Sequence, residues 1–198
     1  MANVIKLRKG LDVNLKGKAA KEEFQVKKPA VYALMPDDFT GMKPKVVVKE
    51  NNVVKVGDSL FVDKNHPEIK FVSPVSGRVT MVERGDRRKV LSVRVEADAE
   101  QQYVDFGKKN VGQMTAQEVK DLLLESGLFG FFRQRPYDVT ANPSDTPKAI
   151  FVSAFNSMPL AADFEYVLRG READFQAGLD ALAKMAKTYL GVSSKQTA

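Results

Sequence analysis

The residues VGDSLF at positions 56–61 and SPVSGRV at positions 73–79 decide how the first half of this chain folds. Both stretches combine short apolar runs with residues that favour turns. Gly57, which is followed by an aspartate, suits a turn because a positive φ costs glycine little. Pro74 ends a strand because it has no N–H to donate, and Gly77 allows a tight reversal into the next strand. The pattern predicts short strands joined by tight turns.

Six short, valine-rich segments fit this pattern. They are residues 31–34, 45–49, 59–62, 69–72, 79–82 and 89–96. In the last segment Leu91, Val93 and Val95 alternate with polar residues, which predicts that these three side chains face the interior. Six short strands separated by turn residues favour a small barrel or sandwich.

These stretches resemble the barrel-sandwich hybrid fold of the biotinyl and lipoyl domains, which commonly has a Gly-Asp turn and a Pro-x-x-Gly-x-Val hairpin. Such domains often carry a cofactor on a lysine at a hairpin tip, flanked by methionine. The hairpin turn at residues 83–89, ERGDRRK, has no such tripeptide, and we expect it to be a solvated, charged turn. A biotinyl/lipoyl-like binding or carrier module without enzymatic activity is the alternative function, because a fold does not fix a function.

The pattern changes to helical spacing after Asp105. Thr115 and Glu118 predict a capping box, the apolar residues that follow recur at helical spacing, and Gly127 suits a left-handed stop. Residues 148–154 predict a strand that is buried on both faces, because its apolar run shows no polar alternation.

Two further helices are predicted at residues 160–168 and 172–190. In the second, the apolar stripe consists of Phe175, Leu179, Leu182, Ala186 and Tyr189. This order is the start of an α/β Rossmann-like domain, but no strand is predicted after Gly191. We therefore expect an incomplete domain that continues in a longer protein.

The sequence thus predicts an α+β chain in three parts. Residues 1–28 are a basic arm, residues 29–110 an all-β barrel-sandwich hybrid domain, and residues 111–198 the incomplete α/β domain.

Composition excludes several kinds of chemistry. The chain has no cysteine, so it has no disulfide framework, thiolate metal site or cysteine nucleophile. Its one histidine, His66, lies in a polar loop, where we expect no role. No nucleotide-binding glycine motif, close carboxylate pair or nucleophile–base set is present, so we expect no catalytic residue and no metal site. No segment approaches the ~18 apolar residues of a membrane span, which indicates a soluble, cytoplasmic chain.

The net charge of +6 is concentrated in the arm, because the first 30 residues hold eight basic and three acidic side chains. One interpretation is a solubilising arm, and another is docking on an anionic membrane face or an acidic partner subunit. Nucleic-acid binding is the weakest interpretation, because the arm has one aromatic residue, Phe24. The docking hypothesis rests on Lys6, Arg8, Lys9, Arg87 and Arg88.

The second candidate site is the run SGLFGFFRQRPY at residues 126–137. Arg133 and Arg135 could donate forked hydrogen bonds to a phosphate or carboxylate. The alternative is that Phe129, Phe131 and Phe132 are ordinary core residues and that the arginines pair with nearby acids. Asn156 follows the predicted strand at 148–154, where open α/β sheets place ligands.

Five motifs, in order along the chain, resemble the A subunit of the bacterial Na+-translocating NADH:quinone reductase. Residues 5–12 (IKLRKGLD) are similar to that family's IKIRKGLD, and residues 56–64 (VGDSLFVDK) to its VGDPLF-DK. Residues 73–79 with 84–88 are similar to its AP-SG-V…RG-RR stretch, and residues 125–128 with 133–136 to its SGLW…R-RP. Residues 150–161 (IFVSAFNSMPLA) are similar to its IFVTAMDTNPLA. The family's chains are more than twice as long, so this chain would be the N-terminal part.

The resemblance implies a peripheral subunit on the cytoplasmic side of the bacterial inner membrane. The complex oxidises NADH, reduces ubiquinone and exports Na+, and its flavins and iron–sulfur centre belong to other subunits. The A subunit is associated with quinone binding, docks on the membrane subunits and does not itself span the membrane.

The same family is related to the C subunit of the Rnf complex and to the flavin-binding subunit of complex I. In those relatives a glycine-rich loop after the same helix cradles flavin phosphate. Residues 127–132 of this chain have fewer glycines and more bulk, which predicts that the chain itself binds no cofactor. Phe129, Phe131, Phe132, Arg133, Arg135 and Asn156 would instead suit a quinone ring and its carbonyls.

Overall fold

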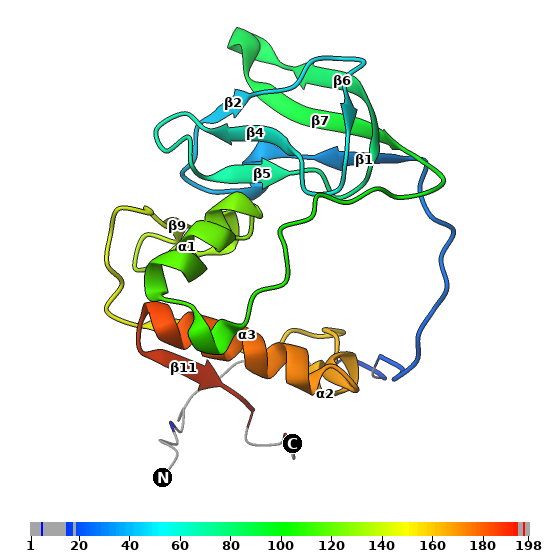
Figure 1. Ribbon diagram of the computed structural model, residues 1–198. Helices are drawn as coiled ribbons and strands as arrows, with labels where there is room; N and C mark the ends of the chain where they lie inside the picture. Colours follow the sequence, from blue (N-terminus) through cyan, green and yellow to red (C-terminus); the bar gives the residue numbers. More distant parts are fainter. Residues whose placement is uncertain (1–4, 6–14, 18, 194–195, 197–198) are drawn as a thin grey trace.

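An all-β module is followed by a mixed helical part in the computed structural model, which describes residues 5, 15–17, 19–193 and 196 (Figure 1). The first sheet of the module has the strand order β1-β7-β6-β3, at Val31–Leu34, Val90–Ala97, Gly77–Arg84 and Val53–Val54. The second has the order β2-β4-β5, at Pro44–Val46, Ser59–Asp63 and Lys70–Val72. Every strand pair in both sheets is antiparallel. The six predicted strands are all present, and the additional β3 is too short for a sequence pattern to register.

The core of the module draws on both sheets. Its most deeply buried apolar side chains are Leu60, Phe61, Ile69, Phe71, Val79, Val93 and Val95. The sequence suggested that Gly77 allows a tight reversal, but its role in the structure is a different one. It begins β6 with a φ of +156°, and a Cβ there would lie 1.8 Å from the carbonyl oxygen of Glu96 on β7. Only glycine therefore allows β6 and β7 to approach at this point.

A β-bulge near the β6–β7 hairpin changes which residues face inward. Glu83 pairs with Ser92 and Arg84 pairs with Val90, which leaves Leu91 as the extra residue. Val90 takes the core position with 5% of its surface exposed, and Leu91 lines a hollow on the outer face of the sheet. Simple alternation therefore predicts Val93 and Val95 correctly but is wrong for Leu91.

Helix α1 (Ala116–Glu125) begins at the predicted capping box. The Glu118 N–H donates to the Thr115 hydroxyl at 3.3 Å, and the Thr115 N–H donates to the Glu118 carboxylate at 2.8 Å. These backbone and hydroxyl hydrogen bonds lower the pKa of Glu118. A 3-10 turn at Val111–Gln113 (η3) precedes the helix. A second, Phe129–Phe131 (η4), and a small hairpin of β8 (Arg133–Gln134) and β9 (Val139–Thr140) follow it.

The last part of the described chain forms a β-α-β unit. Strand β10 (Ile150–Ser153) pairs in parallel with β11 (Thr188–Gly191), and the connection contains α2 (Phe164–Leu168) and α3 (Glu172–Met185). The prediction of a continuous helix over 172–190 is wrong beyond Met185, because the end of that range belongs to strand β11. No strand was predicted there. The expectation of burial on both faces is also wrong, because the side chain of Phe151 is 78% exposed.

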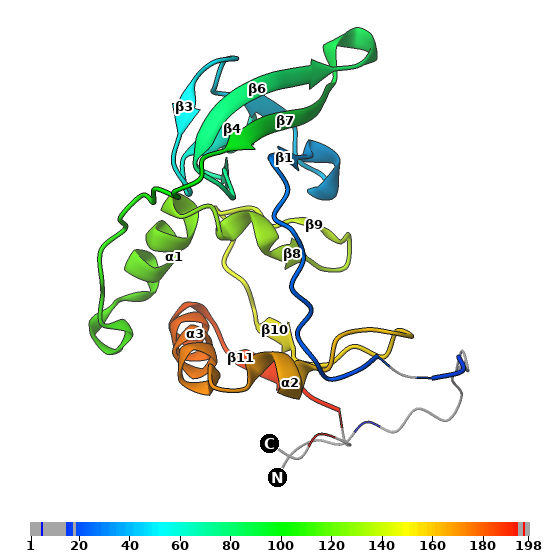
Figure 2. The same cartoon turned by 90° about the vertical axis from the view of Figure 1, so that its right-hand side faces the viewer.

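The continuous described part of the arm, residues 19–28, runs from the module to the β-α-β unit (Figure 2). Lys21 Nζ lies 2.7 Å from a carboxylate oxygen of Asp163, the residue that caps α2. Lys6, Arg8 and Lys9, which the docking hypothesis names, lie outside the described residues.

Candidate functional site

The loop after α1 packs closely against strand β5. A Cβ on Gly127, which has a φ of +76°, would lie 2.7 Å from Val72 Cγ1. A Cβ on Gly130 would lie 2.7 Å from Phe71 Cε1. Because neither space can hold a side chain, both glycines are needed for the loop to pack on the barrel.

A row of aromatic rings connects this loop to the barrel core. The Phe61 and Phe71 rings stack with 5.0 Å between centroids, and Phe39 lies 4.3 Å from Phe71. The ring of Phe131 then contacts Phe39 edge-on at 5.7 Å. Phe131 is 67% exposed, so the row runs from the interior to the surface.

The other two predicted aromatic residues lie behind this surface. Phe129 is 5% exposed and belongs to the barrel's core cluster. Phe132 is half-buried, packs against that cluster and lies 5.4 Å from Phe129. The sequence left open whether these phenylalanines are core residues. The structure places Phe129 in the core and Phe132 against it, whereas Phe131 is accessible.

The two predicted arginines have different surroundings. Arg133 donates to the carbonyl oxygen of Asp138 at 3.3 Å and to that of Asp38 at 3.0 Å, which ties the β8–β9 hairpin to the barrel. Arg135 forms an exposed ion pair with Asp138 at 3.4 Å, and its side chain is 74% exposed. Arg133 is therefore engaged in structure, and Arg135 can reach a partner in solution.

Asn156 lies in a different part of the chain from this cluster. It follows β10, and its side-chain oxygen accepts a hydrogen bond from the N–H of Met158 at 2.9 Å. The loop with Phe131 packs on β5 and α1, whereas β10 packs on β11. The structure thus brings together the aromatic residues and Arg133, and it places Asn156 on another element.

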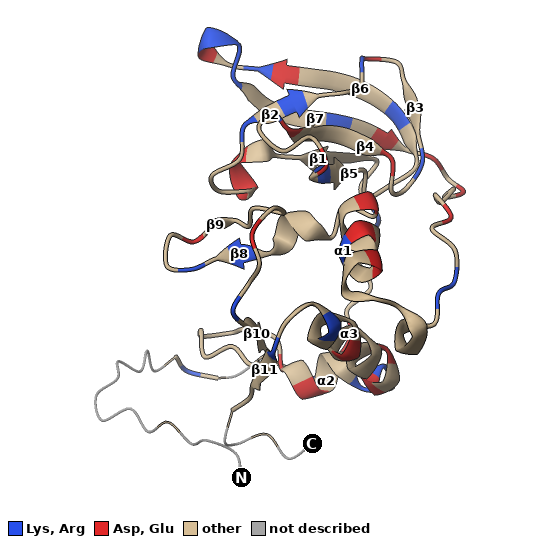
Figure 3. Cartoon of the chain, turned by 60° about the vertical axis from the view of Figure 1, so that its left-hand side comes forward, with Lys and Arg blue, Asp and Glu red and all other residues tan. Residues whose placement is uncertain are grey.

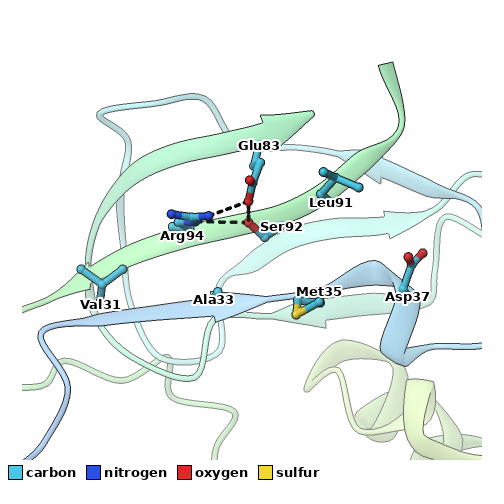
Figure 4. A pocket seen from close by; sticks show the side chains of 8 residues that line it. All are labelled: Val31, Ala33, Met35, Asp37, Glu83, Leu91, Ser92 and Arg94. Atoms are coloured by element: carbon cyan, nitrogen blue, oxygen red, sulfur yellow. Dashed lines mark hydrogen bonds and ion pairs between the residues drawn. The ribbon is translucent and has the colours of Figure 1, made fainter. Parts of the chain in front are cut away.

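A hollow of about 530 Å³ on the outer face of the first sheet was not predicted as a site (Figure 4). Its lining residues are Val31, Ala33, Met35, Asp37, Glu83, Leu91, Ser92 and Arg94. The carboxylate of Glu83 accepts hydrogen bonds from the Ser92 hydroxyl at 2.8 Å and from the Arg94 guanidinium at 2.7 Å. These two donors lower the pKa of Glu83. The polar alternation of β7 gave the signal for Ser92 and Arg94, but nothing in sequence placed Glu83 beside them.

The described residues hold neither a metal-binding cluster nor a membrane-spanning helix. No group of three or more His, Cys, Asp or Glu side chains is arranged to hold a metal ion in that part of the chain. Among the helices described, none is long and apolar enough to cross a membrane.

Two family models match the chain in sequence order, one for each part of the fold. The NqrA N-terminal barrel-sandwich hybrid domain matches residues 5–98, and the NqrA second alpha/beta domain matches residues 114–198. The chain belongs to the NqrA family.

Curated proteins similar to this NqrA-family chain agree with that assignment. The A subunit of the Na(+)-translocating NADH-quinone reductase of Pseudomonas aeruginosa (strain UCBPP-PA14) is 34% identical over 190 residues, which are 94% of this chain and 42% of the relative. The proteins of the same name from Yersinia pseudotuberculosis (serotype O:1b, strain IP 31758) and Serratia proteamaculans (strain 568) are 35% and 37% identical over 186 residues, which are 92% of this chain and 41% of each relative. The chain therefore spans about two fifths of the length of these relatives.

The fold predicted from the sequence is confirmed by these matches: a barrel-sandwich hybrid domain precedes an α/β domain. In this NqrA-family chain the glycines of the loop after α1 serve contacts with the barrel. The space beside Gly130 holds the ring of Phe71, so this glycine allows the loop to approach the barrel closely.

Proposed function

We propose that this chain acts as part of the A subunit of a Na+-translocating NADH-quinone reductase. The observation that carries the proposal is the similarity over both domains to proteins of that name, at 34–37% identity. The chain would lie on the cytoplasmic side of the bacterial inner membrane and assemble with membrane subunits. Those subunits would supply the flavins and the iron–sulfur centre, and this chain would contribute to quinone binding.

Co-purification from native membranes tests the assembly. An affinity tag on the full-length protein should retain other subunits and Na+-stimulated NADH:ubiquinone reductase activity after detergent extraction. Isolation of the tagged protein alone, with full reductase activity left in the untagged fraction, would refute the proposal.

Within this function, Phe131 and Arg135 are exposed members of the predicted set that a quinone could reach. The exposed ring offers a stacking face, and the guanidinium offers donors for a quinone carbonyl. Phe129 and Phe132 would support Phe131 from the core, and Arg133 would hold the hairpin. Asn156 would contribute only if the quinone also contacted the end of β10.

Phe131→Ala in the complete complex should raise the KM for ubiquinone several-fold and leave NADH oxidation by an artificial acceptor unchanged. Tyr137→Ala is a matched control, because Tyr137 lies in the same region and is 78% exposed. A photoreactive quinone should label a peptide that contains Phe131. Labelling confined to peptides outside residues 126–163, or an equal effect of both variants, would contradict the proposal.

A further inference from the structure

The tip of the β6–β7 hairpin is a turn with two arginines at its centre. Its ends are joined by a hydrogen bond from the Lys89 N–H to the Asp86 carbonyl oxygen at 3.1 Å. Arg87 has φ and ψ of 53° and 28°, and Arg88 has a φ of 60°. Positive φ at both central residues is the geometry of a type I′ turn.

The residue types at this tip are not those that the turn prefers. Type I′ turns strongly favour Asn-Gly or Asp-Gly, because glycine and asparagine adopt the left-handed region at low cost. Arg87 and Arg88 adopt it with long side chains, so conformational preference does not explain them. A non-glycine residue held in this region is a reason to look for a function of its side chain.

Both guanidinium groups are available to a partner. Arg87 and Arg88 are exposed and take part in none of the ion pairs found among the described residues. Their neighbour Arg84 donates to the Arg88 carbonyl oxygen at 3.3 Å, which supports the turn, and Lys89 pairs with Asp37 at 2.7 Å. Figure 3 shows the tip as a largely basic projection at the end of the hairpin.

We infer that this tip, defined as residues 84–89, docks onto a carboxylate-rich surface of another subunit of the same complex. The inference rests on the proposed function for the identity of that partner. Arginine forks pair with carboxylates in a fixed geometry, and a rigid turn presents them at low entropic cost. The tip sequence, RGDRRK, has no aromatic or aliphatic side chain for insertion into a lipid layer. A small number of exposed cations without such an anchor binds a membrane only weakly.

Two double variants of the full-length protein test the inference in the complete complex. R87E/R88E reverses two charges, and K55E/K64E makes the same change at two exposed lysines that lie on other loops of the barrel. The measured quantity is the NaCl concentration that releases half of the protein from washed native membranes. R87E/R88E should lower this concentration several-fold, and K55E/K64E should leave it near the wild-type value. Equal effects of the two variants, or no effect of either, would overturn the inference.

A third variant separates recognition from folding. R87N/R88G restores the residues that the turn prefers, so it should raise the Tm of the protein by about 2–4 °C while it weakens membrane retention. A stabilised variant with wild-type retention would contradict a docking role for the arginines.

The chemical class of the partner can be read from cross-linking. Arg88→Lys keeps the charge and adds an amine, which a carbodiimide joins only to carboxylates. A cross-linked band with a second subunit supports the inference. The tip would instead be assigned to lipid if no protein cross-link formed and if the wild-type protein, but not R87E/R88E, bound vesicles of phosphatidylglycerol. If the wild-type protein retains no other subunit at all, the proposed function fails, whereas retention that is insensitive to the tip variants refutes only this inference.

Discussion

Two glycines with the same backbone conformation have different roles in this chain. Gly127 and Gly170 both have a φ of +76°. The position of a Cβ on Gly127 is filled by Val72, whereas nothing lies within 4 Å of a Cβ on Gly170. The first glycine is required by both conformation and packing, and the second by conformation alone.

Alanine substitution separates these two costs. Gly170→Ala should lower the free energy of unfolding by about 1 kcal/mol, the usual cost of a left-handed alanine. Gly127→Ala should cost a further ~1–3 kcal/mol, because Val72 and the backbone of β5 must shift. Urea denaturation of both variants measures the difference. Equal destabilisation would show that the loop is not tightly packed on the barrel.

At the scale of elements, the short strands of the barrel could be predicted from sequence because turn residues mark their ends. In the segment 89–96 the period of two also identified Val93 and Val95 as buried, but it was wrong for Leu91, where one extra residue reverses the alternation. A bulge leaves no clear mark in a single sequence. The position of the strands was therefore predictable, and the local register was not.

The end of helix α3 shows a different limit. Leu182 and Ala186 continue a helical stripe towards Tyr189, yet the helix ends at Met185 and Tyr189 belongs to β11. The parallel pairing with β10 and the stacking of Tyr189 on Phe151 at 5.2 Å act over a distance of 38 positions in the sequence. Local periodicity cannot report such contacts. For the same reason the sequence could not show that Phe129 is a core residue and that Phe131 is exposed.

An ion pair between Lys21 and Asp163 joins the described part of the arm to α2. Asp163 accepts from the N–H of Tyr166 at 3.2 Å as the helix cap, and its other oxygen binds Lys21. The hydrogen bond from Lys21, followed by that from Tyr166, lowers the pKa of Asp163, and the bond to Asp163 raises the pKa of Lys21. Because the folded pKa of the carboxylate is depressed, its contribution is present above the unfolded value of about 3.9 and is lost as the pH falls through the lower, folded value. The lysine contribution is lost only as the pH rises through its raised value.

Asp163→Asn should release the arm without loss of the cap, because asparagine caps helices as well as aspartate. The initial rate of chymotryptic cleavage at Phe24, which is 86% exposed, should rise several-fold at pH 7. Lys21→Gln should give the same increase, and the double variant should add nothing further. Independent, additive effects would show that the two residues do not act as a pair.

At the scale of the whole molecule, the barrel core extends across the boundary between the two family domains. Phe129 lies in the second domain but belongs to the buried cluster of the first, and Leu123 and Leu124 of α1 pack against the same cluster. The β-α-β unit is built differently, because no residue of α2 or α3 is fully buried. An isolated two-stranded sheet has little stability of its own.

This difference predicts two levels of stability within one chain. Amide hydrogen exchange should be slowest in β4, β6 and β7 and, together with them, in α1, whereas α3 and β11 should exchange faster by local opening.

Phe129→Ala should lower the free energy of unfolding by about 3–5 kcal/mol and reduce the protection of the barrel strands as well as of α1, because it leaves a cavity in their shared core. The protection of α3 should change least. Equal protection of α3 and β7 in the wild type would show that the chain opens as a single cooperative unit. A loss of protection in Phe129→Ala that is confined to α1 would show that the barrel does not share its core with the second domain.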